Sequence, residues 1–393
     1  MNIGIFSDCY LPTKNGVSTA IAQARAELLR RGHEVTLFTV AAPGDSGAGD
    51  GCGPVQRVPS LPFNPEIELR IALPRQGCIN RAVADAGLDI IHTHTEFGLG
   101  RAGQAAARAV GLPTVHTLHT LYPDYRHYLP LGRLLPVRTV DAFVRAFVGR
   151  CDAVICPSAK GQAYMASCAP GAATTIIPNG VLPEHFCPTS RLRAARAEGR
   201  AALGIGAEAP VVLYAGRLAP EKRVVALLQA LCPILAADPT VAAVFVGPGP
   251  QGRTLASFGN AMGVGDQILL VGPAAWEEMP RFYALADVFA TASLSEVHPM
   301  TLIEAAACGL PAVARDDPGM CDLVLDGYNG FLVDSDASIT ARLATLLYDA
   351  GTRRAFGRNA ACLAARLTVG AHVDRLEALY RRAIEIHPRK AAQ

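Results

Sequence analysis

The sequence lacks any run of about 18 apolar residues, the length that a membrane-spanning helix needs. Its start turns polar after a few residues and has neither the basic beginning nor the long apolar stretch of a signal peptide. No C-x-x-C pair occurs among the eleven scattered cysteines, so neither a zinc ribbon nor a disulfide framework is expected. An excess of one charge is also missing. The 36 Lys and Arg residues nearly balance the 34 Asp and Glu residues, and a net charge of +2 argues against a nucleic-acid-binding protein. We therefore expect a cytoplasmic chain with reduced thiols.

What the sequence does contain is a large apolar fraction arranged in a regular alternation. Half of its 393 residues are hydrophobic, which is enough for two domains of ordinary size. Within the first forty residues, the pattern predicts a strand at 2–7, a helix at 16–31 and a strand at 34–40. A strand, a helix and a strand joined by short glycine-marked turns indicate a parallel sheet with right-handed crossovers. The alternation continues with strands predicted at 89–92, 113–116, 153–156 and 174–177 and with helical patterns between them.

A turn-rich segment at 178–183 separates this series from a second one. The second series has strands predicted at 211–215, 241–246, 267–271, 288–291, 311–314 and 330–333. The fold class is therefore α/β, with one Rossmann-like domain at 1–182 and another at 183–368, and their parallel sheets are expected to face a central cleft. The tail, 369–386, reads as one amphipathic helix that we expect to pack back on the first domain.

The first strand of each series is followed by a turn that contains glycine. Lys14–Ser18 has Gly16 at the expected start of a helix, where backbone amides can approach an anion. Most strand-to-helix turns contain glycine, so an ordinary turn is an equal alternative. After the strand at 211–215 come Arg217 and Lys222. Cations near a helix start oppose the helix dipole, which favours a bound anion such as a diphosphate over a purely solvated surface.

A pair of glutamates brackets another predicted helix start. Pro299 suits the first turn of a helix, so Glu296 lies on the loop before it and Glu304 one to two turns in. The backbone amides of residues 298–301 would form an anion-binding helix start between two carboxylates that can accept hydrogen bonds from sugar hydroxyls. The alternative is a capping acid and a surface glutamate. Because small apolar residues follow Glu304, a buried carboxylate there needs a partner.

A dense group of polar rings follows the strand at 113–116. The loop after that strand is unusually rich in His, Tyr and Asp, which we interpret as a functional site, although a single histidine would more often be structural. The candidate residues are His119, Tyr122, Asp124, Tyr125, His127 and Tyr128.

Together these motifs resemble glycosyltransferase family 4, retaining enzymes built from two Rossmann-like domains in the GT-B fold. The resemblance rests on Gly216-Arg217-x4-Lys222 followed by Glu296-x7-Glu304, and on Pro178-Asn179-Gly180-Val181. The segments starting at Ser7, at His94 and at His116 look most like bacterial diacylglycerol glycosyltransferases. The resemblance covers essentially the whole chain. The loop Val-His-Pro-Met between the two glutamates differs from the glycine-containing loops common in the family. The resemblance therefore does not determine which sugar is transferred.

The resemblance implies a role for each candidate residue. Arg217 and Lys222 would neutralise the diphosphate of a nucleotide-sugar donor, and Glu304 would bind its ribose. Glu296 would bind hydroxyls of the transferred sugar, with His119 beside that sugar. The loop after His119 would bind the acceptor. The remaining donor contacts would come from Gly16 and from His298, Pro299, Met300 and Thr301.

The resemblance implies hexosyl transfer with retention, and neither a metal nor another cofactor is expected. Asp334-Ser335-Asp336 has the form of a metal-binding D-x-D motif, but it precedes a predicted helix and is interpreted as an N-cap. The resemblance favours UDP-glucose as donor, with GDP-mannose as an alternative. A nucleotide-sugar epimerase and a sugar-binding protein without turnover are the competing classes.

The segment at 133–150 suggests a lipid acceptor and docking on an anionic membrane surface. It reads as a helix with apolar residues at i, i+3 and i+4 spacing, and with Arg138, Arg145 and Arg150 adding positive charge. We therefore expect a peripheral enzyme at the inner face of the membrane. The alternatives are that the apolar face is core, as in any helix that covers a parallel sheet, and that the acceptor is soluble.

Overall fold

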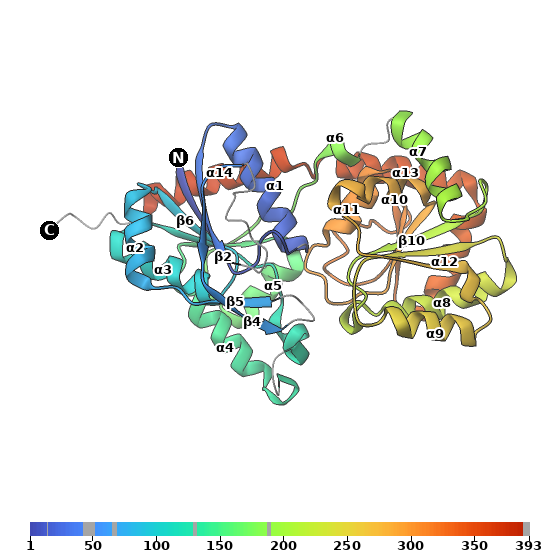
Figure 1. Ribbon diagram of the computed structural model, residues 1–393, viewed down its shortest axis with the longest axis horizontal. Coiled ribbons are helices and arrows are strands. Elements are labelled where there is room, and N and C mark those ends of the chain that lie inside the picture. Colours follow the sequence, from blue (N-terminus) through green and yellow to red (C-terminus); the bar gives the residue numbers. More distant parts are fainter. Residues whose placement is uncertain (14, 42–51, 65–68, 129–131, 187–189, 388–393) are drawn as a thin grey trace. The chain divides into compact units, whose positions relative to one another are not determined.

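The computed structural model describes residues 1–13, 15–41, 52–64, 69–128, 132–186 and 190–387 (Figure 1). By its internal contacts the chain divides into two compact units. The first comprises Met1–Gly180 with Val369–Gln393, and the second Val181–Thr368. Both units are α/β with a parallel sheet, so the predicted fold class is confirmed.

The first unit contains a seven-stranded sheet in the order β3-β2-β1-β6-β7-β8-β9. Its strands are β1 (Asn2–Ser7), β2 (Glu34–Val40), β3 (Val55–Val58), β6 (Ile90–Thr93), β7 (Thr114–Thr117), β8 (Ala153–Cys156) and β9 (Thr174–Ile176). The helices are α1 (Gly16–Arg30), α2 (Gln76–Asp85), α3 (Gly98–Val110), α4 (Val137–Val148), α5 (Ala159–Cys168) and α14 (Val369–Ile386). A separate antiparallel hairpin pairs β4 (Ser60–Asn64) with β5 (Leu69–Ala72), and two 3-10 helices, η2 (Tyr122–Tyr128) and η3 (Gly132–Leu134), precede α4.

The second unit contains a six-stranded sheet in the order β12-β11-β10-β13-β14-β15. Its strands are β10 (Val211–Ala215), β11 (Ala242–Val246), β12 (Ile268–Gly272), β13 (Val288–Thr291), β14 (Ala312–Arg315) and β15 (Gly330–Val333). The helices are α6 (Pro183–Phe186), α7 (Ser190–Ala202), α8 (Val224–Ala237), α9 (Gly252–Ala261), α10 (Met279–Leu285), α11 (Met300–Ala307), α12 (Asp336–Tyr348) and α13 (Ala350–Ala364). The described part of this unit also contains the 3-10 helices η4 (Pro220–Lys222), η5 (Gly265–Gln267) and η6 (Trp276–Glu278).

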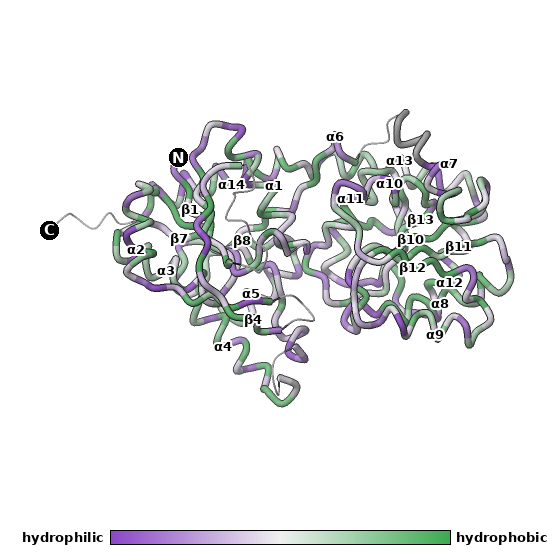
Figure 2. The backbone as a smooth tube through the Cα atoms, in the orientation of Figure 1, coloured by the Kyte–Doolittle hydropathy of each residue, from purple (hydrophilic) through white to green (hydrophobic). Residues whose placement is uncertain are grey.

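Continuous apolar runs form the central strands because helices cover both faces of each sheet. All five residues of β10 and all five of β11 are buried, and Figure 2 colours the centre of this sheet green. The chain reverses direction of winding between β1 and β6 in the first sheet and between β10 and β13 in the second. Ligands of open α/β sheets bind beyond the carboxyl ends of the strands at such reversals. These two edges therefore position the candidate site residues.

Helix α14 returns to the first unit and packs beside α1 (Figure 1). Arg31, which follows α1, binds Asp374 at 2.6 Å and Glu377 at 3.2 Å. His33 Nε2 lies 3.1 Å from the same Glu377 carboxylate, and Tyr380 is fully buried. Polar contacts at one end and a buried ring further along thus fix the last helix against the first sheet.

Helix α4 buries most of the apolar face that was expected, from the sequence, to bind the membrane. Val140, Val144, Phe147 and Val148 are buried, whereas Val137 is 41% exposed. Arg138, Arg145 and Arg150 are all exposed, and Arg145 also donates from Nε to the carbonyl of Cys168. Most of the stripe is therefore core, as for any helix covering a parallel sheet, although Val137 leaves apolar surface at the start of α4. Among the described residues, none forms a helix long and apolar enough to cross a membrane.

Candidate functional site

In the second unit, Lys222 and Glu296 lie together beyond the carboxyl ends of β10 and β13. Lys222 Nζ donates to Glu296 Oε1 at 2.6 Å, and Ser293 Oγ donates to the same oxygen at 3.0 Å. Both charged side chains are mostly shielded from solvent, with 15% and 18% of their area exposed. A cation and a carboxylate that are 74 residues apart in the sequence thus share one small polar site.

Arg217 occupies the turn after β10, where two glycine-containing loops hold it. Leu218 N donates to Pro248 O at 2.7 Å, and Tyr214 OH donates to Arg217 O at 3.0 Å. Gly247 has φ of +137°, and a Cβ there would lie 2.1 Å from the Gly216 oxygen, so only glycine allows this approach. The Arg217 guanidinium pairs with Glu221, in the 3-10 turn η4.

The geometry of the Arg217–Lys222 segment differs in one respect from the sequence interpretation. Lys222 is the last residue of η4, and α8 begins only at Val224, after Arg223 in a left-handed conformation. Lys222 was predicted in the first turn of the helix but precedes it, whereas Arg217 lies on the turn after β10 as predicted. A non-glycine residue with positive φ breaks the helical path at this point.

Glu304 lies inside α11 and is only 4% exposed. Tyr283 OH donates to its Oε2 at 2.7 Å, which provides the partner that the sequence required. The Trp276 indole lies beside the same carboxyl and favours its ionised form. Its buried N–H does not have the distance and angle of a full hydrogen bond to any group in the described part of the chain. Burial raises the pKa of Glu304 from 4.5 to about 7, against the opposing effect of these donors. This carboxyl can therefore change its charge near neutral pH.

Between the two glutamates, the loop leading into α11 is tightly packed. His298 and Met300 are buried and Thr301 is half-buried. Pro299 was predicted in the first turn of a helix, but it is the N-cap residue of α11, directly before that turn. It has no N–H to offer an anion. The interpretation of Asp334–Asp336 as an N-cap is confirmed: Ser335, between the two acids, caps α12, and Asp336 pairs with Arg223 and Arg315.

In the first unit, His119 lies in a cluster of imidazole rings at the carboxyl ends of β6 and β7. His119 Nε2 and His94 Nδ1 are 2.9 Å apart, and the His94 ring packs 4.0 Å from that of His92. Burial lowers the pKa of His119 to about 3, and it lowers the pKa of His94 well below its ordinary value. Both rings are therefore neutral at physiological pH.

The loop that was predicted to bind the acceptor is the 3-10 helix η2. Tyr122 OH donates to the buried carboxylate of Glu96, which also lies 3.1 Å from His116 Nε2. Asp124 is exposed, Tyr125 and His127 are half-buried, and Tyr128 is buried with its ring 4.2 Å from that of His127. The sequence interpretation did not identify Glu96, which anchors the start of this loop.

Gly16 is exposed at the first position of α1. Asn15 caps the helix, accepting from the amides of Val17 and Ser18 at 3.0 Å each. The cap leaves the turn well defined beside the carboxyl end of β1. Lys14, part of the same predicted turn, lies outside the described residues.

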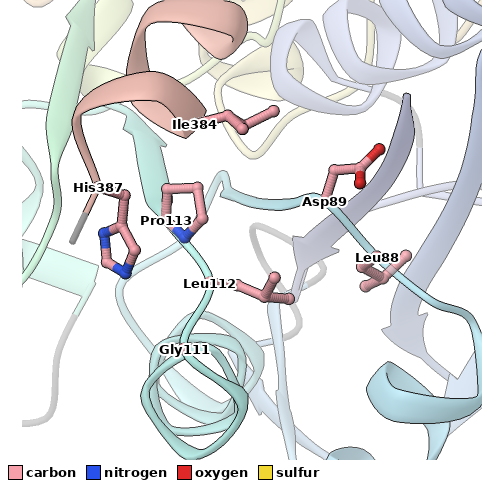
Figure 3. Close-up of a pocket in the computed structure, with 7 residues that line it drawn as sticks. All are labelled: Leu88, Asp89, Gly111, Leu112, Pro113, Ile384 and His387. Carbon is pink, nitrogen blue, oxygen red and sulfur yellow. The ribbon is translucent and has the colours of Figure 1, made fainter. Parts of the chain in front are cut away.

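A hollow of about 140 Å³ in the first unit lies at the opposite edge of the sheet (Figure 3). It is bordered by the segments that lead into β6 and β7 and by the end of α14, where His387 pairs with Asp152 at 2.8 Å. None of the candidate residues lines it, and its position at the amino ends of the strands is not where such folds bind ligands.

The two halves of the chain match two family models. Residues 14–185 match "Glycosyltransferase Family 4" and residues 195–362 match "Glycosyl transferases group 1". The alpha-monoglucosyldiacylglycerol synthase of Streptococcus pneumoniae is 32% identical over 332 residues, covering 84% of this chain and 75% of the relative. The D-inositol 3-phosphate glycosyltransferase of Saccharomonospora viridis is 32% identical over 341 residues, covering 81% and 77%.

A solved structure shares the fold across nearly the whole chain. HepE of Anabaena, crystallised in complex with UDP, has a TM-score of 0.79 at 21% identity and covers 97% of this chain and 100% of its own. The two parallel sheets and these matches define a glycosyltransferase of the GT-B type. The chain belongs to glycosyltransferase family 4.

Proposed function

We propose that this enzyme transfers a hexose from a UDP-sugar, such as UDP-glucose, to the hydroxyl of a lipid such as diacylglycerol, with retention at the anomeric carbon. The second unit binds the donor and the first unit binds the acceptor. The name of the pneumococcal relative supports a glucosyl donor and a diacylglycerol-type acceptor, and the UDP complex of HepE supports the nucleotide. The inositol 3-phosphate relative makes a soluble acceptor the alternative to be tested.

The contact between Lys222 and Glu296 is the observation that carries the proposal. A nucleotide-sugar places the charged diphosphate directly beside the hydroxyls of its sugar, so a site for it needs a cation next to a hydrogen-bond acceptor. Lys222 Nζ and Glu296 Oε1 meet at 2.6 Å beyond the sheet reversal. When the donor binds, the ammonium group turns to the diphosphate and the carboxylate accepts from sugar hydroxyls.

The other donor contacts follow from the same edge of the sheet. Arg217, after β10, adds a second cation for the diphosphate. Glu304, held by Tyr283, accepts hydrogen bonds from the ribose hydroxyls. The backbone and side chains of residues 298–301 border the sugar and phosphate. Gly16 of the first unit approaches the diphosphate, where the absence of a side chain favours close contact.

The chemistry of this proposal is electrostatic. The bond between the anomeric carbon and the diphosphate oxygen breaks, the acceptor oxygen bonds to the same face, and the acceptor proton passes to the departing phosphate oxygen. Arg217 and Lys222 stabilise the charge that grows on the leaving group. His119 lies beside the reacting sugar. Because two protein cations supply this charge, we propose that no metal is required; full activity in excess EDTA tests this point.

The acceptor side is assigned to η2. Tyr122 is tied to Glu96, so it shapes the loop, while Asp124, Tyr125, His127 and Tyr128 lie further along the same segment. For a membrane-bound acceptor, the apolar surface before and at the start of α4 is suitable: Leu134 is 78% exposed and Val137 is 41% exposed. The exposed Arg138 follows directly and suits anionic headgroups. We propose peripheral binding at the inner face of the membrane through this surface.

Incubation with UDP-, GDP- and ADP-sugars, with nucleotide release as the readout, tests the proposal. Release of UDP that depends on added diacylglycerol is the expected result. Release that depends on a soluble acceptor would replace the lipid assignment, and epimerised sugar without release would indicate an epimerase. Binding of a nucleotide-sugar without any turnover in the presence of either acceptor would refute the proposed transfer reaction.

A further inference from the structure

The pairing of His94 with His119 restricts the positions of the protons on both rings. Each ring is neutral, and a neutral imidazole carries one N–H and one bare nitrogen. In the contact of 2.9 Å between His94 Nδ1 and His119 Nε2, one nitrogen must donate and the other must accept. The choice of tautomer on one ring therefore determines the tautomer on the other.

The second nitrogen of His94 indicates which of the two arrangements forms. His94 is 8% exposed, and its Nε2 is buried with no hydrogen-bond partner among the described residues. A buried N–H without an acceptor is rarer in proteins than an acceptor with an unused lone pair. Nε2 of His94 is therefore the bare nitrogen and Nδ1 carries the proton. It follows that His94 donates and His119 Nε2 accepts.

The consequence for His119 is a proton on its other nitrogen. Nδ1 of His119 makes no hydrogen bond within the described part of the chain, and it is not among the fully buried side-chain atoms that lack one. The residue itself is half-buried, so this N–H is open to a ligand. A donor at this position suits a sugar hydroxyl or a phosphate oxygen and does not suit a general base.

We propose that His94 is a positioning residue that fixes His119 with its proton on Nδ1, so that His119 offers the substrate a hydrogen-bond donor. This inference rests on the proposed function, because it assumes that His119 lies beside the reacting sugar. The neighbouring side chains restrict the movement of the His94 ring. His92 packs against it, with its own Nδ1 2.6 Å from Tyr380 OH and its Nε2 2.7 Å from Thr117 Oγ1.

The experiment combines nitrogen NMR of the histidine rings with steady-state kinetics. Protonated and bare ring nitrogens have clearly different 15N shifts, and the His119 signals are assigned by their loss in His119→Asn. His94→Phe keeps a ring against His92 but removes the donor. His94→Asn is the matched control, because its amide nitrogen occupies nearly the position of Nδ1.

Wild-type protein and His94→Asn should both show His119 protonated on Nδ1. In His94→Phe, we expect the proton to move to Nε2 in much of the population and kcat to fall roughly 10-fold, the effect of one misdirected hydrogen bond, with UDP affinity unchanged. A wild-type proton on Nε2, or an unchanged kcat after the tautomer has shifted, overturns the inference. The NMR result needs no turnover, so it also stands apart from a failure of the proposed reaction.

Discussion

Removing the charge of the buried Glu304 carboxyl should change donor binding and folding stability in opposite directions. We consider the substitution Glu304→Gln, which keeps the shape of the side chain and an oxygen that can accept from Tyr283 OH. In the folded protein the pKa of Glu304 is about 7, against an ordinary value of 4.5. Between these two values the folded chain holds a proton that the unfolded chain has lost. Stability should therefore fall as pH rises from 4.5 to 7.

The size of the effect follows from the shift in pKa. A rise from 4.5 to about 7 corresponds to roughly 3 kcal/mol, and the whole penalty is present above pH 7. Urea unfolding should thus find Glu304→Gln more stable than the wild type at pH 8, by an amount up to about 3 kcal/mol, and no more stable at pH 4.5. The neutral amide removes the cost of burying a charge.

Donor binding should respond in the opposite sense. Ribose hydroxyls donate to Glu304 in the proposed function, so binding favours the ionised carboxylate. With a pKa of about 7, roughly a tenth of the free protein is ionised at pH 6. Calorimetry should therefore find UDP bound about 10-fold more weakly at pH 6 than at pH 8. In Glu304→Gln this dependence should vanish apart from the titration of UDP itself, and affinity at pH 8 should be weaker. A variant that is less stable than wild type at pH 8 and binds UDP equally well would refute the reasoning.

The remaining predictions concern the other charged groups. Lys222→Ala should lower kcat about 10-fold or more at saturating donor, because the cation acts on charge that grows in the transition state, and normal turnover would mean that the diphosphate lies elsewhere. Glu296→Ala should reduce turnover more than UDP affinity, unlike Glu304→Ala, and equal losses of UDP affinity in both variants would contradict the two roles. In liposome sedimentation, binding to anionic vesicles should fall with salt and fall again in Arg138→Glu/Arg150→Glu, whereas the matched pair Arg253→Glu/Arg354→Glu, exposed in the second unit, should bind as the wild type does. Absence of sedimentation at low salt, with good activity on a soluble acceptor, would rule out the membrane proposal.

The sequence was most informative where side chains are buried on both sides of a strand. The runs at β1, β8, β10 and β13 read as strands because continuous apolar stretches between glycine-marked turns have few other uses in a chain of this class. The hairpin of β4 and β5 was missed, since Ser60–Asn64 is short, contains Pro62 and is mostly exposed, so no alternation is visible. Helix α2 was missed because only Ile79 and Val83 are buried along it.

The candidate site could be predicted only as far as single motifs allow. Glu304 was expected to need a partner, and Tyr283 fills that role from a different helix, 21 residues earlier. Nothing local to His94 indicates its contact with His119, which depends on the pairing of β6 with β7. The role of Glu96 likewise depends on a distant residue, because its carboxylate accepts from the hydroxyl of Tyr122. Most candidate site residues could be predicted from the sequence. Their contacts could not, because these depend on which strands are neighbours and where each strand ends.

We propose that this chain transfers a hexose with retention from a UDP-sugar to a lipid hydroxyl. The most direct measurement incubates it with UDP-α-glucose and diacylglycerol in anionic vesicles and follows both UDP release and the anomeric proton of the glycolipid by NMR. We expect that UDP is released only when the lipid is present, and that the new glycosidic bond is α. A β-linked product would contradict retention, and UDP release that proceeds equally without the lipid would contradict the assignment of the acceptor.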